Sequence, residues 1–147
     1  MTGMGAFERD LLEQLPLILT GLEQTLKLAV FASVSGLLFG IVVFYFSISE
    51  RKIVRAVVKG YISFFVGMPL IVLLFLMYYG LPQWGIKCSP FTVALIGFTM
   101  NIAAYNAAYL TTAFNGIDRA ELEAARAQGF SALKIFQHII LPQVLRQ

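Results

Sequence analysis

The chain has 147 residues, of which 59% are hydrophobic and 13% are charged, and its mean hydropathy is +0.78. Because soluble proteins carry roughly a quarter charged residues, this composition excludes an ordinary soluble domain and is typical of a membrane protein. The net charge of +3 comes without a basic stripe interleaved with aromatic residues, so nucleic acid is not an expected partner.

Charged residues leave three long uncharged intervals. These intervals are 28–49, 60–86 and 88–117, with lengths of 22, 27 and 30 residues. Each is long enough to cross a bilayer core, which needs about 20 helical residues. We therefore predict an all-α polytopic membrane protein with transmembrane helices over about 26–46, 61–79 and 91–114, surrounded by membrane lipid.

The N-terminal third combines an amphipathic segment with the first span. Residues 7–27 mix leucines with glutamates and glutamines, which predicts a helix lying in the outer membrane interface, broken or kinked at Pro16. The first span, 26–46, contains small residues that allow another helix to approach closely. They are Ser33, Ser35, Gly36 and Gly40.

The second span is interrupted by Gly67-Met68-Pro69, where proline removes a backbone donor, and a kink is expected there. Residues 80–85 then indicate an external turn. Trp84 and the tyrosines before it suit an aromatic belt at the membrane surface. Contact with an external binding protein is the alternative for this turn.

The third span, 91–114, carries a polar load that is unusual for hydrocarbon surroundings. Asn101 and Tyr105 lie four residues apart and share a helix face, and Asn106 lies beside them. These three residues are our candidates for lining a solute pathway. Hydrogen bonding between helices of the bundle is an equally good interpretation.

A polar loop, residues 117–142, follows the third span. Asp118 is a predicted helix N-cap, and Glu121 is placed to complete a capping box. Gly129 is expected to end this helix in the left-handed conformation. Ser131 then caps a second short helix that we expect to run to about His138.

Seven positions of this loop have a specific spacing. They are Glu123, Ala124, Ala125, Gly129, Ile139, Leu141 and Pro142. Two capped helices form a rigid lever, and nearby apolar side chains are expected to anchor it to a soluble partner. The expected anchors are Leu122, Phe130, Leu133 and Phe136. Glu123 either pairs with Arg126 or meets a basic group of the partner.

That spacing resembles the cytoplasmic EAA loop of the membrane-spanning subunits of ABC importers, and we name residues 117–142 the EAA loop. Nearly the whole chain looks like the permease subunit of a polar amino acid ABC importer of the histidine, glutamine and arginine uptake class. The other matching positions are Leu15-Pro16 with Gly21 and Thr25, Gly36 with Gly40, Gly67-x-Pro69-Leu70, Tyr79-Gly80-Leu81-Pro82, and Asn101 with Ala104-Tyr105.

The resemblance implies about five spans and three kinds of partner: ABC ATPase subunits, a second permease subunit in a homo- or heterodimer, and an external solute-binding protein. Three positions depart from the family pattern, because Val66, Ala108 and Thr111 stand where arginine, glutamate and arginine are typical. They leave the transported solute open. Residues 1–147 are expected to form one importer-type transmembrane domain that is incomplete at its C-terminus, where the family continues with two more spans.

No catalytic, cofactor or metal site is expected. The chain lacks the GxxxxGK[ST] pattern of a phosphate-binding loop, so ATP hydrolysis belongs to a partner. His138 is the only histidine, and Cys88 has no second thiol.

Eight of the eleven lysines and arginines lie in the segments 51–59 and 119–146. By the positive-inside rule, both segments are cytoplasmic and the N-terminus lies outside a bacterial inner membrane. We therefore expect a permease subunit that forms part of a pathway for a small polar solute and couples to an ATPase through the EAA loop. The alternative is a truncated, non-transporting or regulatory remnant that keeps the docking loop.

Overall fold

The computed structural model describes the backbone of residues 4–146 and the side chains of residues 12–146, and every regular element in this range is helical. The all-α prediction is therefore confirmed. The elements are α1 (Met4–Ser47), α2 (Lys52–Gly67), α3 (Leu70–Gly80), the 3₁₀ turn η1 (Leu81–Trp84), α4 (Pro90–Phe114), α5 (Arg119–Ala127), α6 (Ala132–Ile135), the π-helical turn η2 (Phe136–Ile140) and α7 (Leu141–Val144).

Helix α1 is longer than predicted. The first span and the amphipathic segment before it form one continuous helix, so the expected break at Pro16 is absent, whereas the placement of residues 7–27 in the outer membrane interface stays a prediction. Pro16 removes a single backbone donor, whereas ending the helix would leave several backbone groups unpaired in apolar surroundings. The stretch Leu12–Ser47 is apolar and long enough to cross a membrane.

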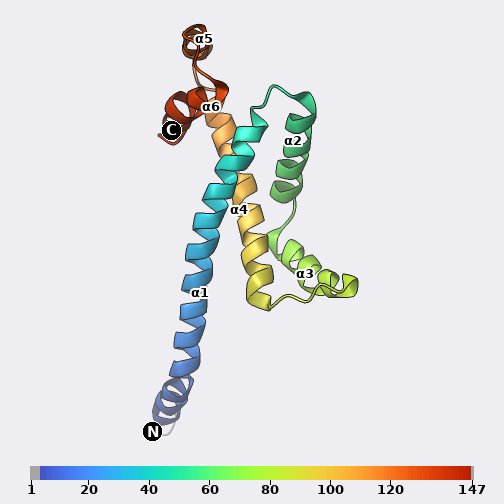
Figure 1. Cartoon of the computed structure of the whole chain (residues 1–147). Coiled ribbons are helices and arrows are strands. Elements are labelled where there is room, and N and C mark those ends of the chain that lie inside the picture. The colour runs from blue at the N-terminus through green and yellow to red at the C-terminus, as the bar shows by residue number, and fades with distance from the viewer. Residues whose placement is uncertain (1–3, 147) are drawn as a thin grey trace.

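Helices α1 and α4 run parallel and form the main packing unit (Figure 1). Ser35 Oγ lies 2.7 Å from Thr99 Oγ1, and Ser47 Oγ lies 2.9 Å from Thr111 Oγ1. Both pairs are separated by 64 residues in sequence. The two helices therefore keep one register over twelve residues, and hydroxyl pairs satisfy their polar groups.

Glycine permits this close approach. A Cβ atom added to Gly36 would lie 2.6 Å from Ile102 Cγ2, and one added to Gly40 would lie 2.8 Å from Asn106 Cβ. No side chain fits at these distances without displacing α4. The predicted role of the two glycines in close helix contact is confirmed.

The second span is broken rather than kinked. Helix α2 begins at Lys52, well before the predicted start, and the α2–α3 pair bends by 102°. Met68, which precedes proline, has extended backbone with φ −99° and ψ 130°. Only α1 and α4 can cross a membrane as single helices in the described range, and the bent pair raises the number to three.

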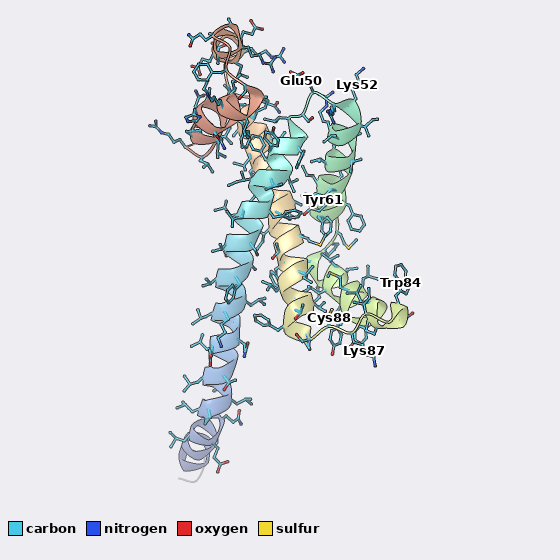
Figure 2. The ribbon with its side chains drawn as sticks, viewed as in Figure 1. Glu50, Lys52, Tyr61, Trp84, Lys87 and Cys88 are labelled. Carbon is cyan, nitrogen blue, oxygen red and sulfur yellow. The ribbon has the colours of Figure 1, made fainter. Side chains whose placement is uncertain are left out.

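The molecule has two distinct ends (Figures 1 and 2). The α1–α2 turn, with Glu50 and Lys52, and the helices α5, α6 and α7 gather at one end. Trp84, Lys87 and Cys88 lie toward the other end, in the connection from α3 to α4. The largest fully buried side chain is Phe44 of α1, which packs near the first end.

Candidate functional site

The first helix of the EAA loop begins as predicted. The Ala120 N–H donates to Oδ1 of Asp118 at 2.9 Å, which confirms the N-cap. The predicted capping box is wrong, because Glu121 Oε2 instead accepts a hydrogen bond from Gln143 Nε2 at 2.7 Å. This bond joins α5 to α7, so Glu121 serves the tertiary structure rather than its own helix.

The end of α5 also follows the prediction. Gly129 has φ +81°, its N–H donates to the Arg126 carbonyl at 3.0 Å, and the Phe130 N–H donates to the Ala125 carbonyl at 3.2 Å. These two bonds form a Schellman motif, which requires a left-handed residue and therefore favours glycine. The turn gives the loop a defined angle between its two helical parts.

The second helical part is capped by Ser131, whose Oγ accepts from the Lys134 N–H at 3.4 Å. It was expected to end near His138, but it continues through η2 and α7 to Val144. The π-helical turn η2 is closed by a hydrogen bond from the Leu141 N–H to the Phe136 carbonyl. Pro142 then occupies the first turn of α7.

One predicted anchor faces inward. The side chain of Phe136 is only 6% exposed, and its ring centroid lies 5.7 Å from that of Phe44 and 4.9 Å from that of Tyr45. Its prediction as a partner-binding anchor is wrong, because the ring fills the core between α1 and the loop. Phe136 therefore fastens the EAA loop to the membrane helices.

The remaining predicted coupling residues divide by exposure. Exposed are Glu123, Ala124, Gly129, Phe130 and Pro142; half-buried are Leu122, Ile139 and Leu141; Ala125 is buried. Leu133, a further predicted anchor, is 52% exposed, and Phe130 is 43% exposed. The structure thus leaves the side chains of Phe130 and Leu133 and the carboxylate of Glu123 exposed on the loop.

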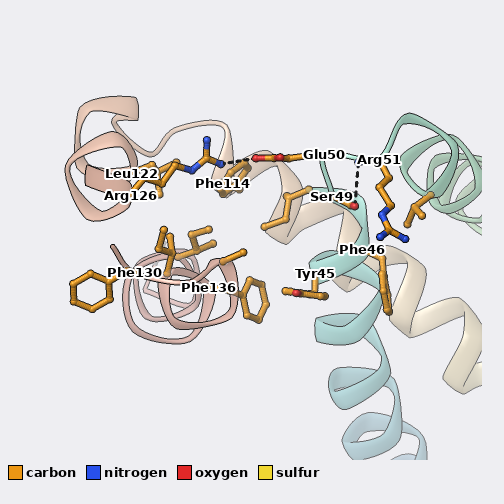
Figure 3. Close-up of a pocket in the computed structure, with 15 residues that line it drawn as sticks. Tyr45, Phe46, Ser49, Glu50, Arg51, Phe114, Leu122, Arg126, Phe130 and Phe136 are labelled. Carbon is orange, nitrogen blue, oxygen red and sulfur yellow. Dashed lines mark hydrogen bonds and ion pairs between the residues drawn. The ribbon is translucent and has the colours of Figure 1, made fainter. Parts of the chain in front are cut away.

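Arg126 does not pair with Glu123, contrary to one of the two predictions for that carboxylate. Its guanidinium lies 3.1 Å from Oε1 of Glu50, in the α1–α2 turn (Figure 3). The ion pair joins the two sides of a pocket of about 480 Å³. The pocket is lined by aromatic and aliphatic side chains that include Tyr45, Phe46, Phe114, Leu122, Phe130 and Phe136.

The predicted pathway residues bind backbone carbonyls of two different helices. Asn101, 9% exposed, donates from Nδ2 to the Phe65 carbonyl at 3.1 Å, and the Tyr105 hydroxyl donates to the Val66 carbonyl at 3.3 Å. Asn106 points instead toward α1 and lies 3.5 Å from the Gly36 carbonyl. The interhelical hydrogen bonding weighed for this face is therefore present, and the pathway role stays a prediction.

Sequence reasoning missed one polar contact of this face. The hydroxyl of Tyr61 in α2 donates to the Met100 carbonyl of α4 at 2.6 Å. A tyrosine within an apolar span is itself a signal, because a buried phenol needs a hydrogen-bond acceptor.

The described residues form an all-helical domain with two or three candidate membrane spans, followed by a capped two-helix loop. The family of binding-protein-dependent transport system inner membrane components matches residues 34–147, and the chain belongs to this family. Its members are translocation subunits rather than enzymes. The resemblance predicted from the EAA spacing is thereby confirmed.

Two curated relatives are permeases named for amino acids. The chain is 36% identical over 135 residues to the probable amino-acid ABC transporter permease protein YckA of Bacillus subtilis, covering 92% of this chain and 60% of the relative. It is also 36% identical over 146 residues to the probable amino-acid ABC transporter permease protein PatM of Vibrio harveyi, covering 97% and 66%.

The fold is similar to that of a solved amino acid ABC transporter crystallised with histidines. The TM-score is 0.78 and the sequence identity is 31%, over 93% of this chain and 64% of the solved one. The chain thus spans about 60% of YckA and less than two thirds of the other two proteins.

Proposed function

We propose that this chain is a permease subunit of an ABC importer for a small polar solute, most simply an amino acid, and that the EAA loop couples it to a separate ATPase subunit. The observation that carries the proposal is the loop's construction. Its surface residues, such as Glu123 and Phe130, are exposed to a partner, while Phe136 fastens the loop to α1. A push on α5 therefore reaches the membrane helices through packed aromatic rings.

The importer would also contain a second permease subunit and an external solute-binding protein. The names of the relatives, which are amino acid ABC transporter permeases, support this assembly and the solute class. Asn101, Tyr105 and Asn106 are proposed to lie along the solute pathway. Tyr105 is the most accessible of the three, with 37% of its surface exposed.

We propose an inner-membrane orientation with the N-terminus outside. The α1–α2 turn with the start of α2, and the segment that follows α4, lie at the same end of the molecule. Eight of the eleven basic residues lie in these segments, at 51–59 and 119–146, which supports placing that end in the cytoplasm. The alternative of a non-transporting remnant is not favoured, because the relatives are named as permeases.

Gly129→Asp tests the coupling role. Gly129 lies in the left-handed region with open space around it, so a charged side chain there strains the turn and projects into the partner surface. We expect co-purification of the ATPase subunit to fall at least about tenfold, as a loss of about 1.4 kcal/mol would give, while membrane insertion persists.

Gly85→Asp is the matched control, because Gly85 also has a positive φ, +83°, and open surroundings, but lies in the turn at the opposite end. It should leave ATPase recovery unchanged. Undiminished recovery with Gly129→Asp would refute the coupling role.

A further inference from the structure

The break between α2 and α3 leaves the last carbonyls of α2 without helical donors, and those of Phe65 and Val66 are among them. In an unbroken helix, the Phe65 carbonyl would accept from residue 69 and the Val66 carbonyl from residue 70. Pro69 has no N–H, and the ladder of α2 ends with the Met68 N–H donating to the Phe64 carbonyl at 3.1 Å. Within residues 4–146, no backbone donor outside the helices replaces these two bonds.

Side chains of α4 supply the missing donors. Asn101 reaches the Phe65 carbonyl and Tyr105 reaches the Val66 carbonyl, at 3.1 and 3.3 Å. The two side chains are one helical turn apart, and they bond to adjacent carbonyls. The two side chains thus pair with two of the carbonyls that the break leaves free, whereas the carbonyls of the earlier turns of α2 have helical donors.

The same helices are joined by a third bond in the opposite direction. The Tyr61 hydroxyl of α2 donates to the Met100 carbonyl, and Figure 2 shows Tyr61 between α2 and α4. We name the hydrogen bonds made by Tyr61, Asn101 and Tyr105 the α2–α4 clasp. Asn101 and Tyr105 bond the carbonyls at the end of α2, and Tyr61 connects the preceding turn of α2 to α4.

We propose that Asn101 and Tyr105 are positioning residues that replace the backbone donors lost at Pro69 and thereby hold the 102° bend that directs α3 away from α2. Unpaired carbonyls are strongly unfavourable in apolar surroundings. With the clasp intact, the broken span keeps its geometry. Without the clasp, the Phe65 and Val66 carbonyls need other hydrogen-bond donors. We expect the angle between α2 and α3 to change so that such donors come within reach.

The bend is measured as a distance between two spin labels. Val57 in α2 and Leu76 in α3 are 67% and 59% exposed, so both accept labelled cysteines in a Cys88→Ser background. The chain is purified together with its associated subunits, and the complex is placed in lipid nanodiscs. Pulsed electron paramagnetic resonance then gives the distance distribution between α2 and α3.

Tyr105→Phe removes only the hydroxyl of the clasp. We expect this variant to broaden or shift the distance distribution. Tyr109→Phe is the matched control, because Tyr109 lies one turn away, is 68% exposed and makes no hydrogen bond through its hydroxyl among the contacts described for residues 12–146. It should leave the distribution unchanged.

Asn101→Leu removes the buried donor and should have the larger effect, with the thermal unfolding midpoint falling by on the order of a few degrees. Pro69→Ala returns an N–H to position 69, which can bond the Phe65 carbonyl itself. In the Pro69→Ala background, the loss of unfolding temperature caused by Asn101→Leu should fall to about half or less, because the effects of interacting sites are not additive.

If Asn101 only fills space, Asn101→Leu should lower the unfolding midpoint equally with Pro69 present and with Pro69→Ala. That result would overturn the proposal. An unchanged distance distribution with Tyr105→Phe would overturn it as well. The Tyr105→Phe readout stands even where Asn101→Leu fails to insert. None of these measurements needs solute uptake, so failure of the importer proposal would be seen separately.

Discussion

At Gly36 the backbone of α1 and the side chain of Ile102 approach so closely that a methyl group does not fit. We expect Gly36→Ala to lower the free energy of unfolding by roughly 1–3 kcal/mol, the usual effect of overpacking. Gly21→Ala in the same helix meets nothing within 4 Å and should stabilise by up to about 1 kcal/mol through helix propensity.

Thermal unfolding of the two variants in the same detergent provides the measurement. Equal midpoints for Gly36→Ala and Gly21→Ala would show that α1 and α4 separate more easily than the structure indicates.

Residue-level predictions from the sequence succeeded where the deciding contacts are local. Asp118, Gly129 and Ser131 make their bonds to residues two or three positions away, so the local cap pattern is enough to predict them. Glu121 and Arg126 were misassigned because their partners lie 22 and 76 residues away, in α7 and the α1–α2 turn. Sequence spacing cannot identify such partners.

At the level of elements, the EAA loop is held by aromatic packing against α1. We expect Phe136→Ala to cost about 3–5 kcal/mol, because it empties a core site next to Phe44 and Tyr45. Phe130→Ala removes a ring that is 43% exposed, so it should change stability far less and mainly weaken partner association.

Limited proteolysis of the EAA loop and co-purification of the ATPase separate the two effects. Phe136→Ala should make the loop sensitive to protease, whereas Phe130→Ala should lower ATPase recovery with the loop still protected. Protease resistance of Phe136→Ala would contradict the anchoring role.

The two long helices were largely predictable, because hydropathy marks apolar stretches of this length. The position of the α2–α3 break was also predictable, since Gly67 and Pro69 are local signals. Its 102° angle was not, because the direction of α3 depends on contacts with Asn101 and Tyr105 far along the chain. Pro16 gave the same local signal without a break, which shows that proline alone does not decide the outcome.

For the whole molecule, orientation in the membrane links the fold to the proposed function. An ATPase reaches the EAA loop only if that end is cytoplasmic, and an external binding protein reaches the α3–α4 connection only if that end is outside. The chain offers a direct test, because its single native thiol, Cys88, lies in the α3–α4 connection and is half-buried rather than enclosed.

We expect a membrane-impermeant maleimide to label Cys88 in intact spheroplasts. In a Cys88→Ser background, Gln128→Cys, at the exposed end of α5, should be labelled only after the membrane is permeabilised. Labelling after denaturation gives the total thiol and corrects for the partial burial of Cys88. The reverse pattern would place the EAA loop outside the cell, where no ATPase subunit could bind it, and would refute both the orientation and the coupling mechanism.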